Sequence, residues 1–311
     1  MTQQVLICGS MAFDSIAVFE GRFKDHILAD RIHTLSVSFL VPTMRKEYGG
    51  CAGNIAYNLK GLGGEPVPVA TVGEDAGDYL DRLKALGIQT RRIKVIPGTW
   101  TAQCFITTDL DDNQITAFHP GAMEYSSSND LSQEQAAWAI VAPDSKAGMM
   151  AHVESLNRAG IPVIFDLGQA MPLFGSEDLI TVLGKVQALA VNDYEAGIVE
   201  QRVGKKMADL AQGLQAIVVT RGAEGATLYT QGKEIAIAPV KASAVVDPTG
   251  CGDAHRAGLL YGLTRGWSWE QSCQLGNVMG AIKIASKGPQ NHRLDRTEID
   301  RMMKSAYGVG L

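Results

Sequence analysis

Two acids and two glycines stand close together at 247–253, within the stretch VVDPTGCGDAHRAG (245–258). Asp247 follows an apolar strand end, and Asp253 precedes an apolar run with the spacing of a helix. A glycine-flanked turn at a helix start leaves backbone N–H groups free to bind an anion such as a phosphate. A carboxylate in the first helical turn is stabilised in its charged form and can accept the proton of a substrate hydroxyl. The stretch therefore favours phosphoryl transfer from a nucleotide to an alcohol.

A simpler interpretation of the same residues has to be weighed. Asp, Pro and Gly commonly cap helices and form turns, and for a bare Gly-x-Gly-Asp this explanation is the better one. The stretch is not a Walker A loop, because the Gly-Lys-Ser/Thr ending is absent, and it is not Gly-x-Gly-x-x-Gly either. The glycines at 250 and 252 still permit a close approach of the backbone to an anion.

Composition narrows the class of protein. The chain has 311 residues, 46% of them hydrophobic, and a net charge of −5. This acidity argues against binding to nucleic acid or to an anionic membrane. Five cysteines without a Cys-x-x-Cys pair argue against a disulfide framework or a structural zinc site. The first residues, MTQQVLICGSMAFD, are not typical of a signal peptide, so we expect a cytoplasmic location.

The predicted strands and helices that must position these residues alternate along the chain. Apolar runs typical of buried strands lie at 5–10, 66–73, 161–167, 188–192 and 215–220, with two more at 225–230 and 234–240. Helical patterns cover 49–64, 75–87, 132–140, 145–159, 254–264, 268–286 and 296–306. This alternation predicts a mostly parallel sheet covered on both faces.

Two β-rich segments do not follow this alternation of strands and helices. Residues 15–48 contain alternating stretches such as 33–41, and residues 99–121 read as a hairpin around an Asp-Asp-Asn turn. We expect them to form a small sheet or lid within a single domain that spans residues 1–311.

The whole context of Val246–Ala254 resembles the C-terminal signature of the ribokinase-like (PfkB) sugar and nucleoside kinases, Asp-Thr-x-Gly-Ala-Gly-Asp. Pro248 replaces the first Thr of that signature and Cys251 replaces its Ala. Residues 49–54, GGCAGN, resemble the second signature, a Gly-Gly pair followed by Asn at a helix start. The resemblance covers essentially the whole chain. It implies a three-layer α/β sandwich of ribokinase type, with a mostly parallel central sheet and a small β-sheet lid.

The same resemblance implies catalytic and sugar-binding roles. Asp253 would be the general base, and the N–H groups of Gly250, Cys251, Gly252 and Asp253 would stabilise the transferring phosphoryl group. Asp14, Gly50 and Asn54 would hold the sugar, since a carboxylate accepts two hydrogen bonds from a cis-diol. Without the Gly-Gly context, Asn54 would be read as a solvated helix position.

The resemblance also implies a nucleotide site that uses ATP and Mg²⁺. Asn192 and Glu195 match the family's Asn-x-x-Glu motif, which orders magnesium and phosphate largely through water. An N-cap followed by a helix acid explains this pair equally well. Thr220 and Gly222 would contact the nucleotide phosphates, and Gly252 and Asn277 would line the nucleotide pocket. Carbonyl-rich segments around Asp247 and at 286–288 resemble a monovalent-cation site, for example for K⁺.

The nature of the acceptor alcohol depends on the lid. Phe105 and Phe118 lie on opposite arms of the predicted hairpin, so we expect both to face one base pocket. Ordinary packing is the better explanation for any single Phe. Bacterial adenosine kinases and broad-specificity nucleoside kinases are resembled by four stretches: GSMAFDSI (9–16), SVSFLVP (36–42), TTDLDDNQITAFHPGAM (107–123) and FDLGQAMP (165–172). By that resemblance the nucleoside would contact Ser10, Ser38, Phe105, Phe118 and Gln169.

The prediction is therefore a kinase that transfers the γ-phosphoryl group of ATP to the 5′-hydroxyl of a purine nucleoside. A ribokinase- or fructokinase-type sugar kinase is the first alternative, and a non-catalytic nucleotide or nucleoside sensor is the second. A dinucleotide-dependent oxidoreductase is disfavoured, because the first strand ends in Cys-Gly-Ser-Met-Ala. We expect a monomer, or a homodimer formed through an exposed strand edge of the lid.

Overall fold

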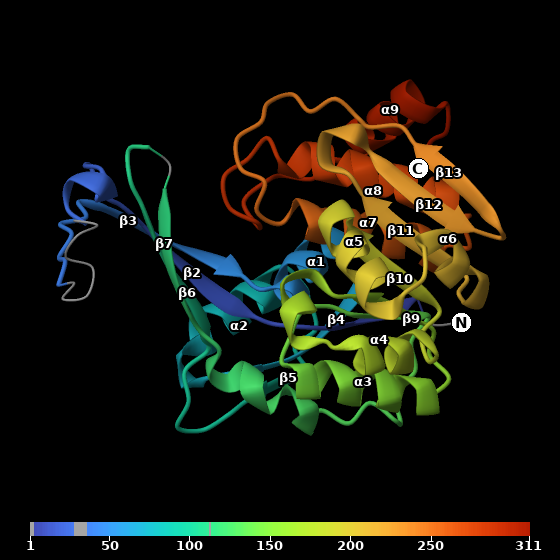
Figure 1. Cartoon of the computed structure of the whole chain (residues 1–311), viewed down its shortest axis with the longest axis horizontal. Helices are drawn as coiled ribbons and strands as arrows, with labels where there is room; N and C mark the ends of the chain where they lie inside the picture. Colours follow the sequence, from blue (N-terminus) through green and yellow to red (C-terminus); the bar gives the residue numbers. More distant parts are fainter. Residues whose placement is uncertain (1–2, 28–35, 112) are drawn as a thin grey trace.

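The structure is a computed structural model that describes residues 3–27, 36–111 and 113–311. Within these residues, nine strands form one large sheet in the order β13-β12-β11-β10-β9-β8-β1-β4-β5 (Figure 1). The seven strands from β11 to β5 are parallel, and β12 and β13 are added antiparallel at one edge. The bounds are β1 Gln4–Cys8, β4 Glu65–Val72, β5 Arg92–Val95, β8 Trp138–Val141, β9 Val163–Asp166, β10 Ala188–Asn192, β11 Ala216–Thr220, β12 Ala226–Thr230 and β13 Lys233–Ile237.

Helices cover both faces of the large sheet, as the alternation predicts (Figure 1). One apolar core joins the sheet to α1, α2, α7, α8 and α9, and a second core joins its other face to α3, α4, α5 and α6. The bounds are α1 Cys51–Gly61, α2 Gly77–Ala85, α3 Lys146–Arg158, α4 Ser176–Leu183, α5 Asp193–Val203, α6 Met207–Leu210, α7 Cys251–Thr264, α8 Trp269–Lys283 and α9 Arg296–Tyr307.

Strand β1 explains why two cores exist. Val5 and Ile7 point into the core under α1 and α7, whereas Leu6 and Cys8 point into the core under α3. Successive side chains of a strand lie on opposite faces, so a strand covered on both sides is apolar throughout. The three-layer α/β sandwich is thus confirmed.

The small sheet has the strand order β3-β2-β6-β7 and stands at one end of the molecule (Figure 1). Its strands are β2 Ala12–Val18, β3 Thr43–Gly49, β6 Ala102–Thr108 and β7 Gln114–His119. The predicted hairpin is confirmed as β6 and β7, which pair antiparallel. The stretch 33–41 lies partly outside the described residues, and residues 36–41 contain no strand.

One predicted helix is wrong. Residues 132–140 were expected to be helical, but Trp138–Val141 is strand β8, which pairs with β1 and β9 in parallel. The sequence AAWAIV is apolar throughout, and a short apolar run carries no periodicity that separates a buried strand from a buried helix. Hydrogen bonds to the neighbouring strands β1 and β9 stabilise the extended conformation.

Candidate active site

The parallel strands of the large sheet end at a common edge, and most predicted site residues lie there. Ser10 follows β1, Asp166 ends β9, Asn192 ends β10 and Thr220 ends β11. In open parallel sheets, ligands bind at the carboxyl ends of the strands. Helix α7 starts at the same edge, because Arg256 in its second turn pairs with Asp166.

The start of α7 has the geometry that the glycines predict. Gly250, its N-cap, has φ +80°, and a Cβ there would lie 2.7 Å from Cβ of Pro289. A Cβ at Gly252 would meet nothing within 4 Å, so the space above it is open. Among the described residues no protein acceptor binds the N–H of Gly252 or Asp253.

Cys251 does not fit the predicted set of anion-binding amides. Its N–H donates to the carbonyl of Pro248 at 3.1 Å and closes the turn. This bond uses the backbone carbonyl of residue 248, so it does not depend on the Pro that departs from the usual signature. The amides of Gly252 and Asp253 are left to face an anion.

Asp253 is partly buried and held from the side. The amide nitrogen of Asn54 donates to its Oδ2 at 2.8 Å. Burial raises the pKa of the Asp253 carboxyl to about 6, against the hydrogen bond from Asn54, which lowers it. A carboxyl with such a pKa is ionised at neutral pH and is still a competent proton acceptor.

Asn54 is neither solvated nor free, since only 5% of it is exposed. Its carbonyl oxygen accepts from Nε2 of Gln290 at 3.0 Å. The same Nε2 lies 2.6 Å from the hydroxyl of Tyr79, which donates to the carbonyl of Gly49 at 2.8 Å. This buried chain fixes Asn54 with its amide nitrogen toward Asp253. The sequence does not predict the roles of Gln290 and Tyr79, because no local motif surrounds either residue.

A buried ion pair lies directly beside Asp253. Nε of Arg256 donates to Oδ2 of Asp166 at 3.0 Å, and both side chains are buried. Asp166 raises the pKa of Asp253 and Arg256 lowers it. Both residues were missed, although each carries a signal: an acid that ends a predicted strand, and a charged residue within an apolar helix.

Asp14 projects from β2 of the small sheet toward this edge. It lies opposite Glu47 of β3, and a Cβ at Gly49 would lie 2.6 Å from its Oδ2. Burial, followed by the charges of Glu47 and Asp247, raises the pKa of Asp14 to about 6. Glu47 in turn accepts a hydrogen bond of 2.7 Å from Asn291.

The Gly-Gly pair lets β3 turn directly into α1. Gly50 has φ +82°, and a Cβ there would lie 2.5 Å from the carbonyl oxygen of Ser10. The hydroxyl of Ser10 accepts from the N–H of Cys51 at 3.2 Å. Ser10 thus holds the start of α1 in this structure.

Asn192 and Glu195 form a closed capping box at the start of α5. The Asn192 side chain accepts from the N–H of Glu195, and the Glu195 carboxylate accepts from the N–H of Asn192, each at 2.8 Å. Burial raises the pKa of Glu195, and Asp166 raises it further. The structure confirms the N-cap interpretation of this pair, whereas the role toward magnesium stays a prediction.

These acids fit a magnesium ion held mainly by a nucleotide. The described residues contain no group of three or more His, Cys, Asp or Glu side chains that could cage a metal. Mg²⁺ is commonly bound by one or two carboxylates, phosphates and water. Glu195 and the nearby Asp166 would provide negative charge for such an ion, and a bound cation would reduce the repulsion between the two carboxylates.

The remaining nucleotide residues are spread along the edge. Gly222 has φ +54° and open space around it, in the turn that follows Thr220. Asn277 is almost fully buried in α8, and its amide nitrogen donates to the carbonyl of Ala238 at 3.0 Å. It fastens the segment after β13 and does not point into open space.

The predicted monovalent-cation site already holds a cation of the chain itself. Nζ of Lys283 donates to the carbonyls of Asp247 at 2.7 Å and of Ser286 at 3.0 Å. The Asp247 carboxylate accepts from the N–H groups of Gly288 and Thr249. Burial raises the pKa of Asp247, but these hydrogen bonds outweigh it and the pKa lies below its usual value. The residues present therefore do not fit a K⁺ ion.

The expectation that Phe105 and Phe118 face one pocket is wrong. Phe118 lies opposite Cys104, which lies opposite Asp14, whereas Phe105 lies opposite Ala117 and Ser15. Residues paired across strands share a face, and neighbours along a strand alternate. Phe118 is thus on the Asp14 face and Phe105 on the other.

Two further predicted nucleoside contacts lie in exposed segments. Ser38 is exposed in the segment before β3, toward the outer end of the small sheet. Gln169 is exposed in the 3-10 turn Gly168–Leu173 that follows β9. The second position adjoins the carboxyl edge of the large sheet, whereas the first is not brought to Asp253.

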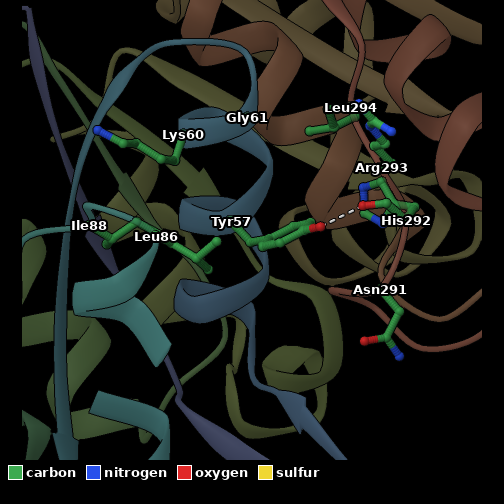
Figure 2. A pocket seen from close by; sticks show the side chains of 9 residues that line it. All are labelled: Tyr57, Lys60, Gly61, Leu86, Ile88, Asn291, His292, Arg293 and Leu294. Atoms are coloured by element: carbon green, nitrogen blue, oxygen red, sulfur yellow. Dashed lines mark hydrogen bonds between the residues drawn. The ribbon is translucent and has the colours of Figure 1, made fainter. Parts of the chain in front are cut away.

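A separate hollow lies beside α1, lined by that helix and by residues 291–294 (Figure 2). Its volume is about 400 Å³, and none of the predicted site residues lines it. The hydroxyl of Tyr57 donates to the carbonyl of His292 at 2.5 Å. This bond ties the end of the segment that carries Gly288 and Gln290 to the body of the protein.

Comparisons with known proteins agree with this geometry. The model of the pfkB family of carbohydrate kinases matches residues 11–296. A nucleoside kinase of Methanocaldococcus jannaschii is 31% identical over 83% of this chain and 85% of its own length. The structure of Burkholderia thailandensis nucleoside kinase in complex with inosine is 48% identical, with a TM-score of 0.88 over 98% of this chain and 99% of that one. The ribokinase of Thermotoga maritima, 20% identical with a TM-score of 0.78, shares the fold.

The three-layer α/β sandwich, with unpaired amides at a helix start and a carboxylate beside them, is the arrangement expected of a phosphotransferase with the ribokinase-like fold. The chain belongs to the pfkB family of carbohydrate kinases, and it is a kinase. The described residues include no helix that is both long and apolar enough to span a bilayer.

Proposed function

We propose that this kinase transfers the γ-phosphoryl group of ATP to the 5′-hydroxyl of a purine nucleoside. The relatives with the most similar sequences and structures support a nucleoside as acceptor. The Burkholderia thailandensis nucleoside kinase binds inosine, and a second structure of it, in complex with ADP-inosine, is 49% identical to this chain. Inosine is a purine nucleoside, which favours a purine here as well.

One observation carries the mechanism. The Asp253 carboxylate, held by Asn54 at 2.8 Å, lies in the same helical turn as the amides of Gly252 and Asp253. Base and anion-binding amides therefore reach one point in space. A hydroxyl beside the carboxylate would be in line with a phosphoryl group on the amides.

The chemical step follows from this arrangement. The 5′-hydroxyl oxygen attacks the γ-phosphorus and gives its proton to Asp253, and the bond from the γ-phosphorus to the bridging oxygen of ADP breaks. The amides of Gly252 and Asp253, with the positive end of α7, stabilise the charge on the transferring group. Magnesium, when bound near Glu195, supplies neutralisation of the polyphosphate charge.

The small sheet would act as the lid of the site. Asp14 of β2 would accept hydrogen bonds from the ribose hydroxyls, and Gly50 and Asn54 would approach the sugar from α1. Phe118, on the same face as Asp14, would stack on the base, and Gln169 would pair with a base edge. Closure of this sheet would exclude water, which otherwise competes as acceptor.

The test is ADP release from ATP and Mg²⁺ across purine and pyrimidine nucleosides, ribose and fructose, with Asp253→Asn alongside. We expect turnover on purine nucleosides and a loss of roughly a hundredfold or more in the variant, which is the scale of general-base catalysis. The variant keeps the size of the side chain, so it should fold normally by circular dichroism.

The alternatives make different predictions in the same assay. Turnover on free sugars without turnover on nucleosides would identify a sugar kinase and remove the role of Phe118. ATP and nucleoside binding without turnover would identify a sensor. Full activity of Asp253→Asn would contradict the assignment of the base, whichever acceptor is used.

A further inference from the structure

Lys283 is a fully buried lysine at the C-terminal end of α8. Its ammonium donates to two backbone carbonyls, those of Asp247 and Ser286, and it forms no ion pair with a carboxylate of the described chain. Lysines are almost never fully buried unless their charge is compensated. Here backbone oxygens provide the compensation, helped by the negative end of the α8 dipole.

Hydrogen bonds connect the backbone segments that surround this ammonium, which are residues 246–249, the end of α8 and residues 286–288. The carbonyl of Ile284, at the end of α8, accepts from the N–H groups of Val246 and Asp247. The Asp247 carboxylate binds the N–H of Gly288 at 2.8 Å and that of Thr249 at 2.9 Å. These bonds hold the carbonyls of Asp247 and Ser286 at 2.7 and 3.0 Å from Nζ of Lys283, and two carbonyl oxygens this close to one point repel each other unless a cation lies between them.

The position of this cluster gives it a consequence for the reaction. Asp247 begins the turn that ends in the amides of Gly252 and Asp253, so whatever fixes Asp247 also fixes those amides. The segment 284–288 continues to Gln290, which orients Asn54 toward Asp253. The turn 247–253, which carries the amides, and the segment 284–290, which orients Asn54, are thus joined at Lys283.

We propose that the ammonium of Lys283 is a built-in monovalent cation, and that the kinase therefore works without potassium. The ammonium group and a dehydrated K⁺ ion carry the same charge and bind the same carbonyl oxygens. A side chain already bonded to those oxygens leaves no place for the ion. Lys283 is a positioning residue, since it acts on the reaction only through the turn 247–253. The proposal rests on the kinase activity proposed above.

The unmodified protein provides the first test. Turnover is measured with K⁺, Na⁺ or tetramethylammonium as sole monovalent cation, at one ionic strength of about 0.1 M so that screening is constant. We expect rates within about twofold of one another, because no ion-specific site is open. Stimulation by K⁺ of about tenfold or more over tetramethylammonium would overturn the proposal.

Lys283→Met provides the second test, because it keeps the length of the side chain and removes the charge. In tetramethylammonium we expect a fall in kcat of at least about tenfold, which is the effect of losing hydrogen bonds from a charged group. Potassium should restore part of this loss, since the space and the carbonyls are now available. Lys241→Met, at an exposed lysine, is the matched control and should behave like the unmodified protein in every salt.

Thermal unfolding separates this proposal from the proposed function. The melting temperature of the unmodified protein should be equal in KCl and tetramethylammonium chloride, and that of Lys283→Met should be lower and rise specifically with K⁺. These shifts need no substrate, so they hold or fail even if no nucleoside is phosphorylated. A folded Lys283→Met protein with unchanged kcat and unchanged melting temperature would contradict the role of Lys283.

Discussion

At the scale of single residues, the environment of Asp253 decides what it can do. Burial raises its pKa to about 6, and the hydrogen bond from Asn54 opposes that rise. In the proposed mechanism the ionised form is the base, so a falling pH would remove activity as the carboxylate takes up a proton. Asn54, set by Gln290, is what keeps the base ionised near neutral pH.

We therefore expect kcat/KM to be constant above neutral pH and to fall as the pH decreases through about 6. In Asn54→Ala the inflection should move to higher pH, by up to about one pH unit, because a bond that favours the carboxylate is lost. The measurement is the pH profile of kcat/KM, which reports groups of the free enzyme.

The titration of Asp14 must be distinguished from that of Asp253, because burial raises the pKa of Asp14 to about 6 as well. Asp14→Asn removes that titration and leaves the surroundings of Asn54 intact. The inflection should persist in Asp14→Asn with a raised KM for the nucleoside. An inflection that vanishes in Asp14→Asn and stays in place in Asn54→Ala would assign the titration to Asp14.

The sequence predicts the base but not the residues that tune it. Asp253 and Asn54 stand in local signatures, where the need for a helix start and a glycine turn is visible in neighbouring residues. Gln290 and Tyr79 reach Asn54 and Gly49 from distant parts of the chain. Their role arises from packing between helices, which local patterns do not encode.

At the scale of elements, the junction between β3 and α1 is the least tolerant point of the site. Gly50 has φ +82° and ψ 140°, and a Cβ there would lie within 2.7 Å of backbone atoms of Ser10, Met11 and Ala12. Backbone atoms cannot move aside as a flexible side chain can. The glycine is thus required both by its dihedral angles and by the close approach of the connection between β1 and β2.

Gly50→Ala should lower the free energy of unfolding by about 2 kcal/mol or more, because strain of about 1–3 kcal/mol adds to the backbone contact. Urea unfolding measures this loss. Gly77→Ala is the control, since that glycine begins α2 with φ −48° and open space around it. Alanine there should leave stability unchanged or raise it by up to about 1 kcal/mol. Equal effects at both sites would contradict the strained junction.

Elements with strong periodicity were predicted, and those defined by their neighbours were not. The helices from Cys51 and Lys146 each show an apolar stripe at helical spacing. Trp138–Val141 is a strand because β1 and β9 flank it, and no pattern within 132–140 contains that information. The register of β6 and β7 likewise needs the turn geometry around Asp109, whose carboxylate binds Asn113.

At the scale of the whole molecule, the two sheets form the two sides of the site. In the proposed site, α7 would supply Asp253 beside the carboxyl edge of the large sheet, and the small sheet would supply Asp14 and Phe118. They are joined by the turn at Gly50 and by the hydrogen bond of 2.7 Å between Asn291 and Glu47. In the proposed function, the face of the small sheet that carries Asp14 and Glu47 would be the one that faces the substrate.

This division predicts opposite outcomes for two similar phenylalanines. Phe105 is 49% exposed and Phe118 is 53% exposed, so their truncation should cost little stability in either case. Phe118→Ala should raise the KM for the nucleoside about tenfold or more, because burying a phenyl ring against the base stabilises by about 1.5–3 kcal/mol. Phe105→Ala should change this KM by less than about twofold, since its ring lies on the other face. Steady-state kinetics on both variants, with gel filtration, checks this. An equal rise in KM in both variants, with an unchanged elution volume, would mean that both faces contact the nucleoside. A rise in KM in Phe105→Ala that accompanies dissociation of a dimer would place that face between subunits.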